Sequence, residues 1–264
     1  RRLPDNDTVL STHKPDTLTL EGEGVAIHGQ GYSARAVTDN LAASYPKAFP
    51  GLLNIGVLHT CMDGREGHEP YAPCSLGDLM SRGYDYWALG HVHSQEIVSR
   101  SPLVVFSGNT QGRNIREKGA KGCMLVFVED NEITDVAFKS LDVFRWSSLE
   151  LDVSGAKHID DIFDIAERAV QREAKTVSMP SAVRISLTGS SRLHGMMLSQ
   201  EEHVKNGIRA CAVDAGNGNI WVEKICFNTK EISAPPMTQA GSNALTGLLS
   251  SINSLQYDEK VLQE

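Results

Sequence analysis

Three nearly continuous apolar runs constrain the fold of this chain more than any other feature of its sequence. They lie at residues 52–58, 86–89 and 103–106. Apolar runs without polar alternation are typical of strands that are covered on both faces. Between the first two runs, residues 75–82 have the length of a short helix, and Gly83 behind them suits a left-handed cap. The sequence therefore predicts a layered α/β domain.

Shorter elements are expected around these runs. A helix is predicted at 34–44, with Ser33 as its cap. Residues 123–128 and 133–138 flank a polar turn, so they predict an antiparallel hairpin that closes the first unit. Three short strands are expected near the start of the chain, at residues 9–11, 17–20 and 25–28.

A different pattern begins near Trp146. Residues 149–153 alternate strictly between apolar and polar, and residues 158–175 place apolar side chains on one helical face. Two more apolar runs, at 182–187 and 220–227, predict strands. Together these segments predict a small β-α-β-β unit, which we interpret as an α+β accessory domain.

The predicted domain boundaries follow from these patterns. Residues 1–143 are expected to form part of the layered domain, and residues 144–230 the accessory or capping domain. Residues 231–264 are expected to hold a proline-containing linker and a last amphipathic helix at 243–255.

Composition excludes several classes of protein. The 264 residues are 41% hydrophobic and 22% charged, far from the composition of disordered chains. No apolar run approaches the roughly 20 residues of a membrane span, so no membrane partner is expected. A formal net charge of −8 gives no overall basic field for nucleic acid, so an anionic substrate must meet a local patch or a metal.

The five cysteines form an odd set without a Cys-x-x-Cys pair. Such usage favours reduced thiols and a cytoplasmic protein over a disulfide framework. We therefore expect no structural disulfide.

Three histidines follow two of the apolar runs. His59 ends the first run, and Gly90-His91-Val92-His93 follows the second. In an extended strand, residues i and i+2 point to the same side, so His91 and His93 are expected to aim into one cavity. Ligands of open α/β sheets bind beyond the carboxyl ends of the strands, where these histidines are placed. Imidazoles gathered there predict a transition-metal site; the alternative is that each is simply hydrogen-bonded at a strand end.

These motifs and their order resemble a known family, the calcineurin-like metallophosphoesterases. Within that family, the resemblance is to the bacterial DNA repair exonuclease branch, which includes SbcD-like and YhaO-like proteins. It implies a layered α/β sandwich of which this chain forms the C-terminal part. The segments that carry the resemblance are NIGVLHT (54–60), YAPCSLGDL (71–79), GYDYWALGHVH (83–93), VVFSGNTQGRNIREKGAKGC (104–123) and WVEKI (221–225).

The resemblance also implies a mechanism and the residues that carry it. Members of the branch hold two divalent metal ions, commonly Mn²⁺, which activate water to attack the phosphorus of a phosphodiester. By the family's pattern, His59 and His91 would bind one metal and His93 the other. The implied function is a DNA exonuclease or related nuclease in DNA repair, with DNA or another phosphodiester as substrate. A homodimer and an SbcC-like ATPase partner are implied as well.

The chain departs from the family in the motifs that supply carboxylate ligands. Asp-x-His, Gly-Asp-x-x-Asp and Gly-Asn-His-Asp are the family's opening motifs, and none of them occurs here. The chain also begins without an initiator Met. We therefore expect it to be the C-terminal part of a longer phosphoesterase, and to be inactive or nearly so by itself.

The segment at 107–121 carries four basic residues and one acidic residue, Glu117, in an otherwise acidic chain. Its two early glycines would let the backbone approach a phosphate, and Arg113 is suited to bind a phosphate oxygen in bidentate fashion. Asn109 and Arg113 are therefore the expected substrate-binding residues. An ordinary solvated basic loop is the alternative.

Two other functions stay open at this point. One is a non-catalytic binding or scaffold module that recruits a partner through the accessory domain and the last helix. The other is a hydrolase with a single zinc ion bound by His59, His91 and His93 alone.

Overall fold

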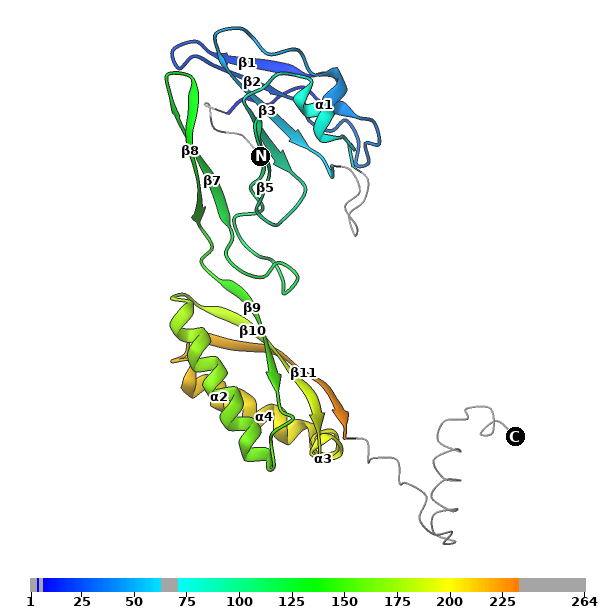
Figure 1. The fold of residues 1–264 in the computed structure, drawn as a ribbon, viewed down its shortest axis with the longest axis vertical. Coiled ribbons are helices and arrows are strands. Elements are labelled where there is room, and N and C mark those ends of the chain that lie inside the picture. Colours follow the sequence, from blue (N-terminus) through cyan, green and yellow to red (C-terminus); the bar gives the residue numbers. More distant parts are fainter. Residues whose placement is uncertain (1–3, 5–6, 63–70, 233–264) are drawn as a thin grey trace, which may run out of the picture.

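A computed structural model of the chain describes residues 4, 7–62 and 71–232. The expected proline-containing linker and the helix at 243–255 lie outside the described residues. Two layered units follow one another along the long axis of the molecule, and the chain passes from the first to the second between β8 and β9 (Figure 1). The mixed α/β fold class that the sequence predicts is confirmed.

The first unit contains a six-stranded sheet whose centre is formed by the predicted apolar runs. Its strand order is β1-β2-β3-β4-β6-β5. The neighbours from β2 to β6 pair in parallel, while β1 and β5 pair antiparallel at the two edges. The strands are β1 (Asp16–Leu20), β2 (Val25–Gly29), β3 (Leu53–His59), β4 (Tyr86–Gly90), β5 (Glu96–Arg100) and β6 (Leu103–Phe106).

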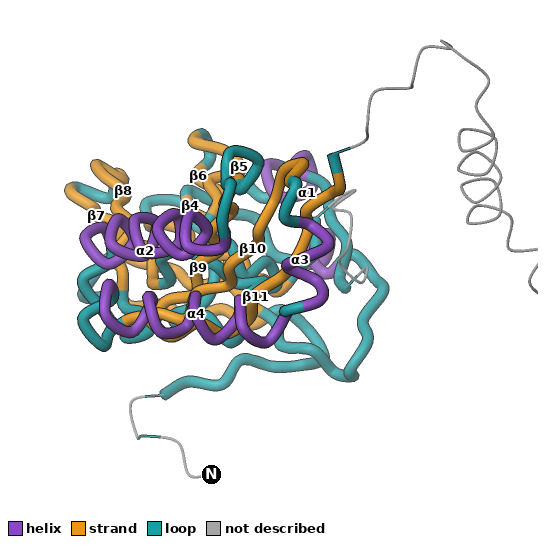
Figure 2. Tube along the Cα trace, turned by 90° about the horizontal axis from the view of Figure 1, so that it is seen from below, coloured by secondary structure: helices purple, strands orange, loops and turns teal. Residues whose placement is uncertain are grey.

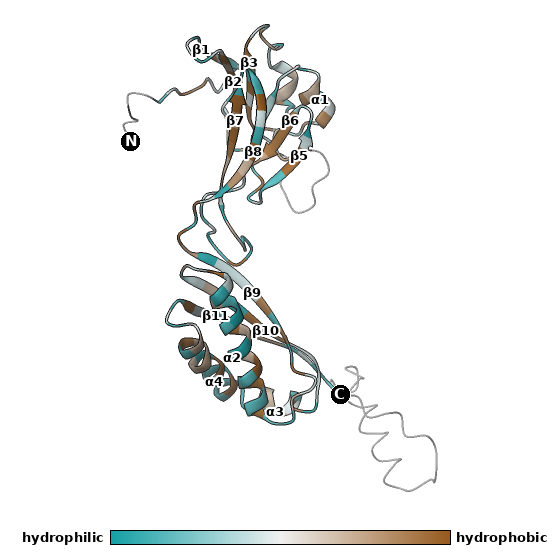
Figure 3. Cartoon of the chain, turned by 60° about the vertical axis from the view of Figure 1, so that its left-hand side comes forward, coloured by the Kyte–Doolittle hydropathy of each residue, from teal (hydrophilic) through white to brown (hydrophobic). Residues whose placement is uncertain are grey.

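Both faces of this sheet carry apolar clusters, as uninterrupted apolar runs predict. One face packs Trp87 and its neighbours against the short elements η1 (Leu41–Ser44) and α1 (Leu76–Met80). The other face packs Tyr86 and its neighbours against the hairpin of β7 (Gly122–Glu129) and β8 (Glu132–Ser140). The strand β6 stands out as hydrophobic in Figure 3.

The hairpin and the short helix are confirmed. Strands β7 and β8 pair antiparallel, and Asp130 and Asn131 between them have φ values of 51° and 64°. Positive φ at both central positions is typical of the tight turns that match strand twist. Ser75 caps α1, since its hydroxyl accepts a hydrogen bond from the Asp78 amide, and Gly83 behind the helix has φ of 83°.

Two predictions near the start of the chain are wrong. Residues 9–11 form no strand: the Ser11 amide donates to the Asp16 carboxylate, and the Ser11 carbonyl makes only one bond, with Gly31. The helix predicted at 34–44 is reduced to η1, which is capped by Asn40 rather than Ser33. The Val37 carbonyl accepts from the Ala72 amide instead of serving a helix. Strand β5 was not predicted, since its residues are half-buried without clear alternation.

The second unit is a three-stranded parallel sheet in the order β11-β10-β9. The two long helices, α2 and α4, lie side by side and pack on one face of this sheet (Figures 1 and 2). The exposed side of α2 is hydrophilic (Figure 3). The elements are β9 (Arg145–Asp152), α2 (Ile159–Thr176), β10 (Ser181–Ser191), α3 (His194–Ser199), α4 (Glu201–Ala215) and β11 (Ile220–Glu231).

The order β-α-β-β predicted for this unit is wrong, because α3 and α4 lie between its last two strands. The sequence pattern of α4 is weak: its buried stripe consists of Val204, Ile208 and Ala212, and Gly207 interrupts it. That glycine is required by packing, since a Cβ there would lie 2.3 Å from the ring of Phe163 on α2. The crossover through α3 and α4 is what makes β10 and β11 parallel.

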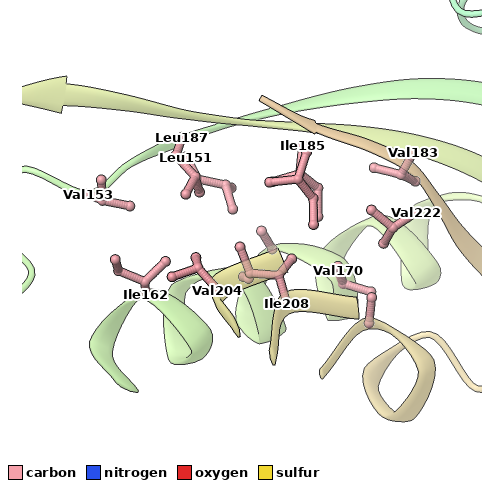
Figure 4. Close-up of a cluster of buried hydrophobic side chains, with 14 of the residues drawn as sticks. Leu151, Val153, Ile162, Val170, Val183, Ile185, Leu187, Val204, Ile208 and Val222 are labelled. Atoms are coloured by element: carbon pink, nitrogen blue, oxygen red, sulfur yellow. The ribbon is translucent and has the colours of Figure 1, made fainter. Parts of the chain in front are cut away.

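The core of the second unit lies between the sheet and the helices. Side chains from β9, β10 and β11 point toward side chains from α2 and α4 (Figure 4). The sheet contributes Leu151, Val183, Ile185, Leu187 and Val222, and the helices contribute Ile162, Val170, Val204 and Ile208. Within the described ranges, no helix is both long and apolar enough to cross a membrane. All five cysteines are free thiols.

The close contact of β3 with Trp87 yields a stability prediction. Gly56→Ala is expected to lower the free energy of unfolding by about 1–3 kcal/mol, as overpacking of a core does. A Cβ at this position would lie 2.3 Å from Cε3 of the fully buried Trp87. Urea denaturation followed by tryptophan fluorescence measures the change. Gly22→Ala is the control, since its Cβ would meet nothing within 4 Å; equal losses in both variants would contradict the prediction.

Candidate metal centre

The predicted histidines lie where three neighbouring parallel strands end. His59 is the last residue of β3 and pairs in register with Gly90, the last residue of β4. His91 and His93 follow directly, and the loop at 107–121 follows β6. A side chain at Gly90 would crowd the ring of His59, because a Cβ there would lie 3.0 Å from its Nδ1. These segments therefore meet at one edge of the sheet, as parallel topology requires.

His59 and His91 lie side by side. The distance from His59 Nε2 to His91 Nδ1 is 3.2 Å, and the rings are nearly perpendicular, with an angle of 82°. The ring of Tyr32 packs edge-on against His59, and the ring of Tyr71 against His91. The hydroxyl of Tyr32 donates to the His59 carbonyl at 2.6 Å, and burial raises the pKa of this hydroxyl to about 12, so it stays a donor. The pair is therefore framed by two tyrosines that the sequence did not single out.

The spacing of this pair suits a metal ion. Two imidazole nitrogens bound at about 2.0–2.1 Å to one metal, at right or tetrahedral angles, lie about 2.9–3.4 Å apart. The observed 3.2 Å falls in that range. Burial, and then the nearby His93, lowers the pKa of His59, which favours the neutral imidazole that a metal requires. His59 and His91 therefore fit as two ligands of one divalent metal.

His93 does not join this pair in the way the sequence predicts. The expectation rests on extended backbone, but β4 ends at Gly90 and His91 has φ of 107°. Positive φ is rare for a histidine and breaks the alternation of side chains. Nδ1 of His93 lies instead 2.8 Å from a carboxylate oxygen of Glu117. Among the residues that the structure describes, no three His, Cys, Asp or Glu side chains are grouped closely enough to hold a metal.

Glu117 is a functional candidate that the sequence analysis missed. Its side chain is only 8% exposed, and its oxygens accept hydrogen bonds from His93, Asn109 and Arg113. The Arg113 guanidinium, together with these other donors, lowers the pKa of the carboxyl to about 2, so it is ionised at neutral pH. The one available signal was the Arg113–Glu117 spacing of four residues inside a basic segment.

The two expected substrate-binding residues both contact this carboxylate. Arg113 donates to it from its amide, at 2.8 Å, and from its guanidinium, at 2.8 and 3.2 Å, although the arginine side chain is 65% exposed. Asn109 donates through Nδ2 at 2.8 Å, while its buried Oδ1 has no hydrogen-bond partner among the described residues. The Glu117 carboxylate therefore anchors Arg113, whose side chain still reaches solvent. Asn109 has one acceptor, Oδ1, that is unsatisfied among the described residues.

The loop at 107–121 is not simply a solvated basic loop. Lys121 is buried and donates to the His93 carbonyl at 2.8 Å. Trp146, at the start of the second unit, donates through its indole to the Gly112 carbonyl at 3.1 Å, and its own carbonyl accepts from Gly119. The loop thus connects the His93 region to β9, while Arg116 and Lys118 stay exposed.

Comparisons with known proteins bear on both units. Residues 146–230 match the family described as the middle domain of metallophosphoesterase YhaO. Over 192 residues, the chain is 37% identical to a curated protein of Bacillus subtilis (strain 168), described as the uncharacterized metallophosphoesterase YhaO. This alignment covers 71% of the chain and 47% of the relative, so the chain spans about half the length of the curated protein it matches.

Proposed function

Since this chain belongs to the metallophosphoesterase family, we propose that it supplies the histidine ligands of a centre that hydrolyses phosphodiesters with two divalent metal ions, preferably Mn²⁺. The observation that carries the proposal is the His59–His91 pair, whose nitrogens are 3.2 Å apart at the carboxyl edge of a parallel sheet. When bound, divalent metals would polarise the phosphoryl oxygens and activate the attacking water.

The residues of the chain have distinct tasks in this proposal. His59 and His91 bind one metal, and His93 contributes to the second. Arg113 presents its exposed guanidinium to a phosphate oxygen while its ion pair with Glu117 limits its motion. Positioning and charge neutralisation account for most of the catalysis in phosphoryl transfer, so a fixed arginine beside the histidines is well placed to contribute.

The proposed substrate is DNA, and the proposed role is that of an exonuclease or related nuclease in repair. The exposed Arg113 lies 2.9 Å from Nδ1 of His93, and Arg116 and Lys118 are exposed on the same loop. These cations offer phosphate contacts on a chain whose net charge is −8. Phosphate contacts of this kind are weakened by salt. The resemblance further suggests an SbcC-like ATPase partner and a homodimer, and the five free thiols agree with a cytoplasmic location.

We further propose that the carboxylate ligands come from outside the described residues, in a longer protein. A metal pair needs more negative charge than three neutral imidazoles supply, and the described residues bring no third ligand to the His59–His91 pair.

One experiment tests this proposal in two arms. The complete gene product is expected to hydrolyse linear duplex DNA in the presence of Mn²⁺, and to lose this activity with a chelator. The 264-residue chain alone is expected to show no more than background activity. Failure of the complete product to bind Mn²⁺ would overturn the proposed function. Manganese-dependent hydrolysis by the chain alone, abolished by His91→Ala, would instead overturn the claim that its ligand set is incomplete.

A binding or scaffold role is the second candidate. The observation that favours it is the lack of any three-residue metal-binding group within the described part of the chain. A complete gene product that folds, takes up no Mn²⁺ and still captures a partner through residues 146–230 would support this role. The zinc hydrolase with three histidines has less support, since no three possible ligands among the described residues are grouped closely enough to hold one metal.

A further inference from the structure

Glu117 contacts His93 and Asn109, two side chains that each carry both hydrogen-bond donors and acceptors. Nδ1 of His93 lies 2.8 Å from its Oε1, and Nδ2 of Asn109 lies 2.8 Å from its Oε2. An ionised carboxylate accepts hydrogen bonds and donates none. A hydrogen bond from His93 to this carboxylate therefore requires the proton on Nδ1, and the bond from Asn109 requires its amide nitrogen to face the carboxylate.

The contact between Arg113 and His93 competes with the contact between Glu117 and His93. Nη2 of Arg113 lies 2.9 Å from Nδ1 of His93 and 2.8 Å from Oε1 of Glu117. The guanidinium nitrogen can only donate, so its contact with Nδ1 is a hydrogen bond only in the tautomer that lacks the Nδ1 proton. In the Nδ1-protonated tautomer, both nitrogens instead donate to the same oxygen of Glu117, which is ionised and is the acceptor that they share.

The contacts with Glu117 determine what His93 Nε2 and Asn109 Oδ1 can bind. With its proton on Nδ1, the neutral His93 imidazole carries a lone pair on Nε2, the form that binds a metal. With Nδ2 used, Asn109 is left with Oδ1, which is buried and unsatisfied among the described residues. A buried carbonyl oxygen without a partner is costly, so such an atom is well suited to receive a donor or a cation.

We propose that Glu117 is a positioning residue. By accepting hydrogen bonds from Nδ1 of His93 and Nδ2 of Asn109, it leaves the lone pairs of His93 Nε2 and Asn109 Oδ1 available to the metal and the substrate. This inference deepens the proposed function and rests on it. Carboxylates commonly play this role behind histidine ligands of metals, where they fix the tautomer and the ring orientation. Arg113 completes the arrangement by holding the carboxylate from the solvent side.

The simpler reading is that Glu117 only stabilises the loop through its ion pair with Arg113. The tautomer of His93 distinguishes the two readings, because a purely structural ion pair does not require the Nδ1-protonated form. This property is measurable without metal, by long-range ¹H–¹⁵N correlation spectra of the 264-residue chain with ¹⁵N-labelled histidine. The His93 signals are assigned with His93→Gln.

The wild-type chain is expected to show His93 as the Nδ1-protonated tautomer. Glu117→Gln, which keeps the shape but adds a donor, is expected to shift His93 toward the other tautomer or a mixture. Glu117→Asp, as a second variant, keeps the charge and is expected to retain more of the wild-type tautomer. Glu129→Gln, an exposed carboxylate at the end of β7, is the control and is expected to change nothing. An Nε2-protonated His93 in the wild type, or a spectrum unaffected by Glu117→Gln, would overturn the proposal.

Metal affinity separates this inference from the proposed function. In the complete gene product, Glu117→Gln is expected to weaken Mn²⁺ binding, followed by electron paramagnetic resonance, by about 10- to 100-fold. Equal affinity in wild type and Glu117→Gln would reject the positioning role and leave the proposed function standing. The predicted tautomer together with no Mn²⁺ binding in any variant would support the positioning of His93 and reject the metal-dependent function.

Discussion

Replacing His91 with alanine is expected to lower kcat/KM for phosphodiester hydrolysis by the complete gene product by at least about 100-fold. The substitution removes Nδ1 from a pair of nitrogens that are 3.2 Å apart, and leaves His59 as a single donor. Replacing a residue that hydrogen-bonds to a metal ligand commonly lowers metal affinity or activity by about 10- to 100-fold. Replacing the ligand itself should lower them by at least as much. Mn²⁺ affinity is expected to fall in parallel.

The backbone at this position complicates the alanine variant, and a second variant resolves it. His91 has φ of 107°, a conformation that strains any residue with a Cβ. His91→Gly relieves the strain while it also removes the imidazole. If the imidazole is the functional group, both variants lose activity and the glycine variant unfolds at higher urea than the alanine variant. His203→Ala, on the exposed side of α4, is the control. Near wild-type activity in His91→Gly would contradict a ligand role for this histidine.

The position of the histidines at the sheet edge could be predicted from sequence because it depends on topology. Continuous apolar runs fixed β3, β4 and β6 as buried strands, and parallel strands end at the same edge. Two of these strand ends carry the histidines: His59 ends β3, and His91 and His93 follow β4. The topology therefore brings the histidines near each other. The pattern of apolar residues and the order of the strands are sufficient to place the histidines at this edge.

The contacts of individual side chains could not be predicted in the same way. His91 and His93 would share one side only in an extended backbone, whereas φ of 107° at His91 turns the chain out of the strand. Glu117 was counted as one negative charge in a basic loop, but it lies buried behind His93. Sequence spacing gives no information on which of several polar residues in a loop becomes buried.

The errors in secondary structure have a related cause. Residues 34–44 have helical spacing, but Asn40 and the bond from Ala72 to Val37 favour an irregular segment with one short turn. Helix α4 has a short buried stripe, and its identity depends on packing against α2, where Gly207 meets Phe163. Local propensity is weak beside tertiary contacts in both cases.

The expected division of the chain near residue 144 leads to a prediction about stability. The cluster in the second unit draws all of its buried residues from 151–225, and the two clusters of the first unit draw theirs from 42–106. Since the two sets share no buried apolar residue, a defect in one core should leave the other intact. Hydrogen exchange, which reports on local opening, can resolve the two units separately.

Ile185→Ala is therefore expected to lower the free energy of opening of the second unit by about 2–5 kcal/mol, as large-to-small substitutions in cores do. Ile185 is fully buried on β10 between the sheet and the helices (Figure 4). Amides in β9, β10 and α2 should lose protection, while those in β3 and β4 keep theirs. Ser186→Ala, the next residue on the same strand, is half-buried and serves as the control. An equal loss of protection in both units would mean that they unfold together, and would refute separate domains at 1–143 and 144–230.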